Sequence, residues 1–161
     1  MFSMAAGGGL AGELSANDGK PVLLRLQVAK PVQIDCQTKS VVVADNAADA
    51  TNGTLKLTLL LKDETGTPAT GAWRIADVGP LHRGSLGTHE AKTCAQACPL
   101  RVAGDGNLEL WSPAPKGVDQ LAAGERLLLA VIKADTLALR ATTFSGKDIE
   151  ALEEGLCRIV P

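Results

Sequence analysis

Both histidines of this 161-residue chain and two of its four cysteines lie within one stretch, residues 82–98. The order His82, His89, Cys94 and Cys98 gives the spacing His-x6-His-x4-Cys-x3-Cys. Imidazole and thiolate are ligands that zinc prefers, but structural zinc sites usually pair them at gaps of about two to four residues. The stretch therefore allows three interpretations: a metal site, a local or cross-chain disulfide, or uncoordinated side chains.

The rest of the sequence offers no recognisable catalytic set. The triplet at residues 7–9 is all glycine but lacks the Lys and Ser/Thr that end a phosphate-binding loop. We interpret Glu150, Glu153 and Glu154 as the solvated face of a helix and not as an acid–base pair. We therefore expect no enzyme activity and no cofactor.

Composition argues against several kinds of partner. The chain has two Phe, two Trp and no Tyr, so it has few rings on which a sugar or a single-stranded nucleic acid could stack. The net charge of −2 comes without a basic cluster, which argues against nucleic acid and anionic membranes. No apolar run approaches the roughly 18 residues that a membrane-spanning helix needs. We expect no nucleic-acid partner and no membrane insertion.

The cysteines leave the compartment open. Residues 1–12 contain no Lys or Arg, so they lack the charged region of a secretory signal. We expect either a cytosolic chain or one whose signal has been removed. For Cys36, Cys94, Cys98 and Cys157 we favour reduced or mixed thiols, with two disulfides as the alternative.

The clearest structural pattern is an alternation of leucines. Leu55, Leu57, Leu59 and Leu61 occupy every second position, which predicts a strand with one buried face. Residues 63–71 then supply turn chemistry. Further strands are expected at residues 22–28, 32–37, 41–44, 73–75, 108–111, 127–132 and 136–144, with a turn at 38–40 and an irregular stretch at 77–99.

One helix is expected near the C-terminus. Ser145 and Asp148 resemble a capping box, and Ile149, Leu152 and Leu156 follow at helical spacing. The glycine-rich residues 1–19 are expected to form a flexible arm, and residues 20–161 a single domain. Together these features predict an all-β sandwich with one short C-terminal helix.

Residues 43–72, with the turn Asp63-Glu-Thr-Gly-Thr-Pro-Ala-Thr-Gly71, resemble the opening of a bacterial immunoglobulin-like domain of the invasin and intimin type. Residues 103–110 are similar to a later strand element of that family, so the resemblance extends over about residues 43–110. It implies an immunoglobulin-like sandwich with a binding or structural role and no catalytic residues. The segment 77–99 has no counterpart in the family.

These observations favour a non-enzymatic structural or binding module of a larger assembly. We expect a virion protein, either capsid-decorating or tail-associated, or a cell-surface protein. It would be oligomeric or assembly-bound, through protein–protein contacts made by arm exchange or edge-strand pairing. The alternative is a periplasmic or secreted domain that binds a metal or a redox partner through His82, His89, Cys94 and Cys98.

Overall fold

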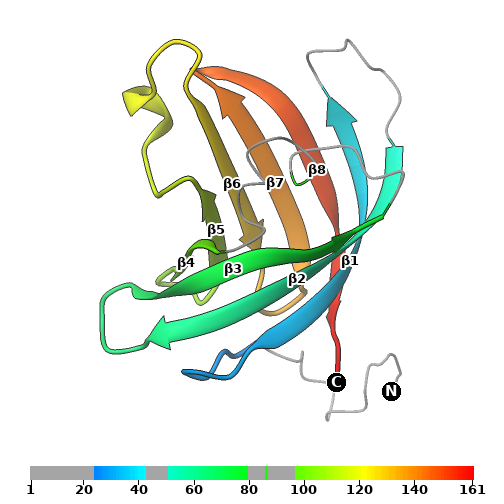
Figure 1. The fold of residues 1–161 in the computed structure, drawn as a ribbon, viewed down its shortest axis with the longest axis vertical. Helices are drawn as coiled ribbons and strands as arrows, with labels where there is room; N and C mark the ends of the chain where they lie inside the picture. Colours follow the sequence, from blue (N-terminus) through cyan, green and yellow to red (C-terminus); the bar gives the residue numbers. More distant parts are fainter. Residues whose placement is uncertain (1–23, 43–50, 80–85, 87–96) are drawn as a thin grey trace.

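The chain forms a closed antiparallel β-barrel (Figure 1). The computed structural model describes residues 24–42, 51–79, 86 and 97–161. Within them, eight strands pair in chain order, and the last strand pairs with the first. The strands are β1 (Val32–Val42), β2 (Thr51–Asp63), β3 (Ala69–Val78), β4 (Cys98–Val102), β5 (Leu108–Ser112), β6 (Arg126–Ile132), β7 (Ala138–Ser145) and β8 (Asp148–Ile159).

Aliphatic side chains fill the interior of the barrel. The four alternating leucines of β2 all point inward and are at most 4 % exposed, which confirms the predicted strand and its buried face. They belong to a core that also contains Trp73, Leu86 and Leu110, none of which is more than 1 % exposed. Side chains this inaccessible leave no room for a water molecule against them, so the interior is a packed core.

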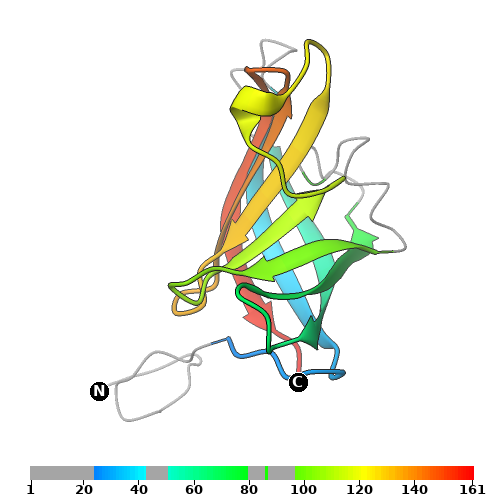
Figure 2. The same ribbon diagram turned by 90° about the vertical axis from the view of Figure 1, so that its left-hand side faces the viewer.

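A smaller apolar cluster lies on the outside of the wall. Trp111 and Leu127 pack there against Leu121, which follows the short 3-10 helix η4 (Val118–Gln120). In Figure 2 this connection lies against the upper part of the barrel. Residues 127–132 are therefore apolar on both faces, as the sequence predicts, because the barrel core lies on one side and Trp111 and Leu121 lie on the other.

The predicted immunoglobulin-like sandwich is wrong. In Figure 1, β2 and β3 cross in front of β6 to β8, and β1 and β8 run side by side along nine paired residues. Short strands separated by turns occur in sandwiches and in barrels alike, so the pattern of strands does not decide between the two. The decisive element is β8, which closes the barrel.

The predicted C-terminal helix is also wrong, because residues 148–159 form β8. The inward positions of β8 are Ala151, Glu153, Gly155 and Cys157, which are small or polar, so they hide the period of two. The apolar residues at helical spacing face outward or lie near the strand ends. Ser145 and Asp148 are paired ends of the β7–β8 hairpin, whose turn contains Gly146 with φ of 59°.

Other predictions have mixed outcomes. The turn at 38–40 is wrong, since β1 continues through it and buries Thr38. The stretch 77–99 was expected to be irregular, but β4 begins at Cys98. The strands at 73–75, 108–111 and 136–144 are confirmed with different ends. The arm at residues 1–19 lies outside the described residues.

A disulfide joins the two strands that close the barrel. Cys36 of β1 and Cys157 of β8 lie directly opposite each other, with their Cα atoms 4.0 Å apart. Cys98 is also disulfide-bonded, and Cys94 lies outside the described residues. The preference for reduced thiols is therefore wrong for the described cysteines. We call the paired strands β1 and β8 the seam.

The backbones at the seam approach closely at Gly155. A Cβ atom at this position would collide with the carbonyl oxygen of Gln37 and would lie 2.8 Å from the Cα of Thr38. Because these are backbone atoms on the paired strand, they have little freedom to move aside. Glycine is thus required here for β8 to pair with β1 at full contact.

We predict that Gly155→Ala destabilises the protein by about 3 kcal/mol, because the added methyl forces the two seam strands apart. The measurement is urea unfolding followed by circular dichroism. Gly104→Ala is the matched control, since nothing lies within 4 Å of a Cβ at that position. An unfolding midpoint for Gly155→Ala equal to that of the wild type would contradict the close pairing of the seam.

Candidate functional site

Only one of the four predicted metal ligands, Cys98, is among the residues that the structure describes. Cys98 lies at the start of β4, is 8 % exposed and is disulfide-bonded, so it has no thiolate to offer a metal while that bond is intact. His82, His89 and Cys94 lie outside the described residues, and their role stays a prediction. Among the residues that are described, no group of three or more His, Cys, Asp or Glu side chains is arranged to hold a metal ion.

Glu153 lies inside the barrel and not on a solvated face. It is 1 % exposed, and its Oε1 accepts a hydrogen bond of 2.9 Å from the backbone N–H of Leu86. The interpretation of the three glutamates as one solvated helix face is therefore wrong for Glu153. Glu154 points outward, with a side chain 72 % exposed, as alternation along a strand requires.

Two threonines flank Glu153 on the neighbouring strands. Thr38 of β1 pairs with Gly155, and Thr143 of β7 pairs with Ala151. Both hydroxyl groups are buried, and neither donates or accepts a hydrogen bond in the described part of the barrel. Within this polar layer Glu153 anchors Leu86 in the core, and burial separates the layer from molecules in solution.

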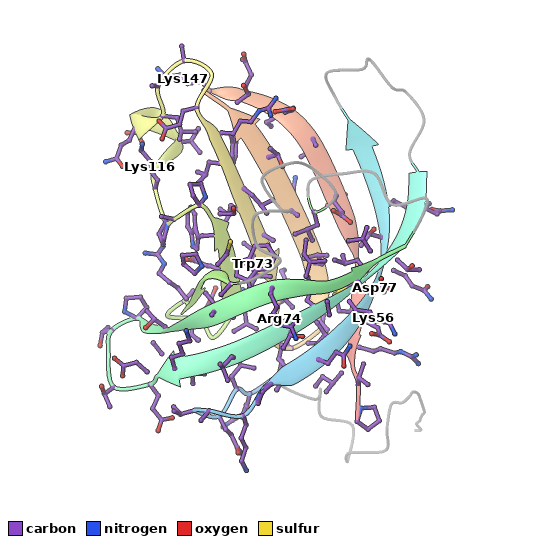
Figure 3. The ribbon with its side chains drawn as sticks, viewed as in Figure 1. Lys56, Trp73, Arg74, Asp77, Lys116 and Lys147 are labelled. Atoms are coloured by element: carbon purple, nitrogen blue, oxygen red, sulfur yellow. A yellow bond between two sulfur atoms is a disulfide. The ribbon has the colours of Figure 1, made fainter. Side chains whose placement is uncertain are left out.

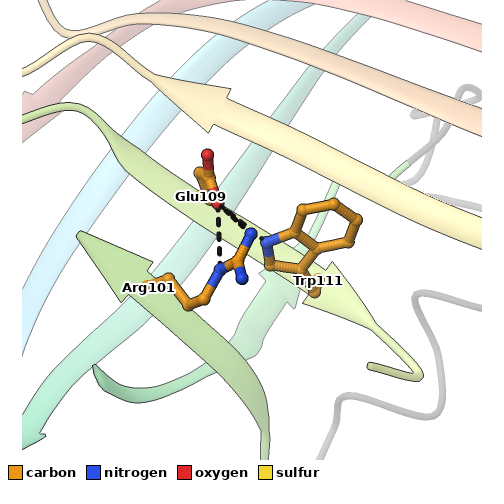
Figure 4. A network of polar contacts seen from close by, with 3 residues as sticks. All are labelled: Arg101, Glu109 and Trp111. Carbon is orange, nitrogen blue, oxygen red and sulfur yellow. Dashed lines mark hydrogen bonds and ion pairs between the residues drawn. The ribbon is translucent and has the colours of Figure 1, made fainter. Parts of the chain in front are cut away.

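A second polar network lies on the outer wall at β4 and β5 (Figure 4). Glu109 Oε1 accepts hydrogen bonds from Arg101 Nη2 at 2.9 Å and from Trp111 Nε1 at 3.1 Å. The Arg101 guanidinium also lies 5.2 Å from the centre of the Trp111 ring. Each charge in this network already has a partner within it, so the network holds Trp111 in place and is not a candidate binding site.

The remaining candidate is a groove on the outside of the seam. It has a volume of about 570 Å³ and spans β1, β2, β8 and the end of β3. Its outward-facing lining is formed by Asp35, Gln37, Thr54, Lys56, Asp77, Leu156 and Arg158. The disulfide Cys36–Cys157 lies beneath it, so the floor of the groove is covalently fixed.

The charged residues of the groove form a single row across four strands. Asp77 of β3 pairs with Lys56 of β2, and Lys56 pairs with Asp35 of β1. Asp35 pairs in turn with Arg158 of β8, across the seam. Figure 3 labels Lys56 and Asp77, side by side on β2 and β3. We call Asp77, Lys56, Asp35 and Arg158 the charge row; at strand spacing it spans about 14 Å.

The charges of the row are poorly satisfied by the part of the chain that the structure describes. The closest contact joins Arg158 Nη2 and Asp35 Oδ2 at 3.8 Å, beyond hydrogen-bond distance. Asp35 Oδ1 is buried and has no hydrogen-bond partner among the described residues, although the side chain as a whole is 27 % exposed. Lys56 and Asp77 form no ion pair in the described part of the chain.

An apolar residue stands beside the charge row. Leu156 of β8 pairs with Gln37 of β1, which pairs with Thr54 of β2, so these three form the next row along the strands. Leu156 is 64 % exposed, the largest exposure among the large apolar side chains that the structure describes. The groove therefore combines unsatisfied charges with an exposed aliphatic side chain, a combination suited to binding another macromolecule.

No known protein family, curated protein or solved structure matches the chain. The resemblance of residues 43–110 to invasin-type domains is thus neither supported nor refuted by a relative. In the described residues there is no helix of the length and apolarity needed to cross a membrane.

Sequence reasoning missed the groove for a geometric reason. Successive residues of the charge row are separated by 21, 21 and 123 positions along the chain, and only strand register brings them together. The available signal was weak: each residue occupies an outward position next to a buried one. For Arg158 even this signal was weaker, because the residues before it on β8 were predicted as a helix and only residues 158–161 as a brief edge segment.

We predict that Glu153→Leu destabilises the barrel by about 2 kcal/mol, because the N–H of Leu86 loses its acceptor inside the core. Glu153→Gln keeps an acceptor oxygen and should lose about half as much. Urea unfolding measures both, with the exposed Glu154→Gln as the matched control. Equal stability of Glu153→Leu and Glu154→Gln would contradict the buried position of Glu153.

Proposed function

We propose that this protein is a non-enzymatic binding module that contacts other protein chains through the groove on the outside of the seam. The observation that carries the proposal is the charge row, whose Lys56 and Asp77 have no ion-pair partner within the described chain. Charged groups on a fixed sheet favour a protein partner, because they select orientation and register at little cost in conformational entropy.

The filled interior supports the same proposal. An eight-stranded barrel either packs its interior with side chains or encloses one small ligand. Here Leu57, Trp73 and Leu110 are at most 1 % exposed, so the barrel serves as a rigid frame. The outer wall is then the part of the described molecule that is available for recognition.

Barrel closure changes the expected mode of contact. Strands β1 and β8 pair with each other, so neither offers an open edge to another chain. Contact through an added edge strand is therefore replaced by contact through side chains. Arm exchange by residues 1–19 lies outside the described part of the chain.

The disulfides favour an oxidising compartment. Bonds such as Cys36–Cys157 persist at cell surfaces, on virion exteriors and in the periplasm. We favour an assembly in such a setting, either at the cell surface or on the exterior of a virion, where this bond persists.

A photo-crosslinking amino acid at position 37, in the centre of the groove, tests this proposal in cells that make the protein naturally. We expect discrete protein adducts that weaken when Lys56→Glu is added. The control places the crosslinker at Lys147, an exposed position in the β7–β8 turn at the far end of the barrel (Figure 3). Failure to form adducts at position 37, or equal adducts at both positions, would contradict the proposal.

A further inference from the structure

We propose that the charge row is a dimer interface, in which a second copy of this chain lies on the same groove. The inference rests on the proposed function and names the partner. From β3 to β8 the row alternates in sign: Asp77, Lys56, Asp35 and Arg158. When a row with an even number of alternating charges is reversed in direction, every position of the row carries the opposite sign of charge.

Two-fold symmetry supplies this reversal. An axis in the contact plane, parallel to the strands and midway between β1 and β2, turns the row of the second copy end to end. Lys56 then lies opposite Asp35 of the second copy, and Asp77 lies opposite its Arg158. With the two symmetry-related pairs, all four charges on each copy face an opposite charge.

The dimer supplies the partners that the charge row lacks among residues 24–42, 51–79, 86 and 97–161. Among the described residues, Asp35 Oδ1 has no hydrogen-bond donor and Lys56 has no carboxylate within ion-pair distance. Lys56 and Arg158 have long side chains, and the Arg158 side chain is 82 % exposed. The groove of about 570 Å³ gives the two basic side chains of the second copy space to reach Asp35 and Asp77.

The apolar residue next to the row fits the same symmetry. The backbone N–H of Gly79 donates to the carbonyl of Thr54, so Gly79 ends the row that contains Thr54, Gln37 and Leu156. Reversal of this row places Leu156 opposite Gly79 of the second copy, where the Thr54 hydroxyl fills the space that a Cβ of residue 79 would take. The exposed leucine would therefore be covered by Gly79 and Thr54 of the second copy.

Charge-reversal variants test the register of the dimer by sedimentation equilibrium. Lys56→Glu places two Glu–Asp pairs across the axis, and Asp35→Lys places two Lys–Lys pairs there. We expect each variant alone to dimerise at least about tenfold more weakly than the wild type. An equimolar mixture should dimerise again, because the substituted side chains at positions 56 and 35 then face each other with opposite charges, and so do the two native ones.

Exposed positions provide a second pair of variants in case Asp35→Lys does not fold. Asp77→Arg and Arg158→Asp should likewise dimerise weakly alone and recover when they are mixed. Lys147→Glu makes the same charge change outside the groove and should leave the dimer unchanged. Wild-type dimerisation should also weaken in 1 M NaCl, where the screening length falls to about 3 Å.

A wild-type protein that stays monomeric at millimolar concentration would overturn the dimer. So would single variants that dimerise like the wild type, or mixed variants that fail to recover. These results differ from failure of the proposed function. Crosslinks from position 37 to a different protein would leave the groove as a binding surface and would exclude only the second copy.

Discussion

The structure depends on the pairing of the first strand with the last. Strand β1 contacts β8 along nine residues, and Cys36–Cys157 bonds the two strands at a point where they lie opposite each other. This pairing satisfies the backbone groups that would otherwise form two open sheet edges. It also turns a twisted sheet into a closed wall around a core of leucines, whose burial is the main stabilising contribution.

Closure requires particular side chains on β8. Gly155 lets the two backbones approach, and Glu153 holds the backbone of Leu86 within the core. Small and polar residues at the inward positions of one strand are compatible with a stable core because β2 and β3 supply large side chains, among them Leu57 and Trp73. The interior thus contains large apolar side chains from β2 and β3 and a thin polar layer at β8.

The same closure creates the candidate site. Arg158 is at the end of the chain and Asp35 is near its beginning, and only the seam makes them neighbours. Without β8 the row would contain three charges, acidic at both ends, and reversal would place like charges opposite one another. The fourth charge makes the row self-complementary, so the proposed dimer depends on the barrel being closed.

Local patterns predicted those parts of the fold in which a strand has one apolar face. The leucines of β2 and the double-sided apolar run of β6 are examples, because each residue type there reflects its own burial. Prediction failed at β8, where the inward residues Ala151 and Glu153 are small or polar and do not reveal the buried face of a strand. Because β8 is the strand that closes the barrel, missing it made a barrel indistinguishable from a sandwich. The charge row depends on register between distant strands, which composition and spacing do not encode.

The most direct test of the account is a measurement of backbone contacts across the seam by nuclear magnetic resonance. The paired positions of Cys36 and Cys157, with Cα atoms 4.0 Å apart, predict a strong Hα–Hα nuclear Overhauser effect between these residues. Slow amide exchange should accompany it along both strands. Absence of this contact, with fast exchange along one side of β1, would show an open sheet and contradict the closed barrel.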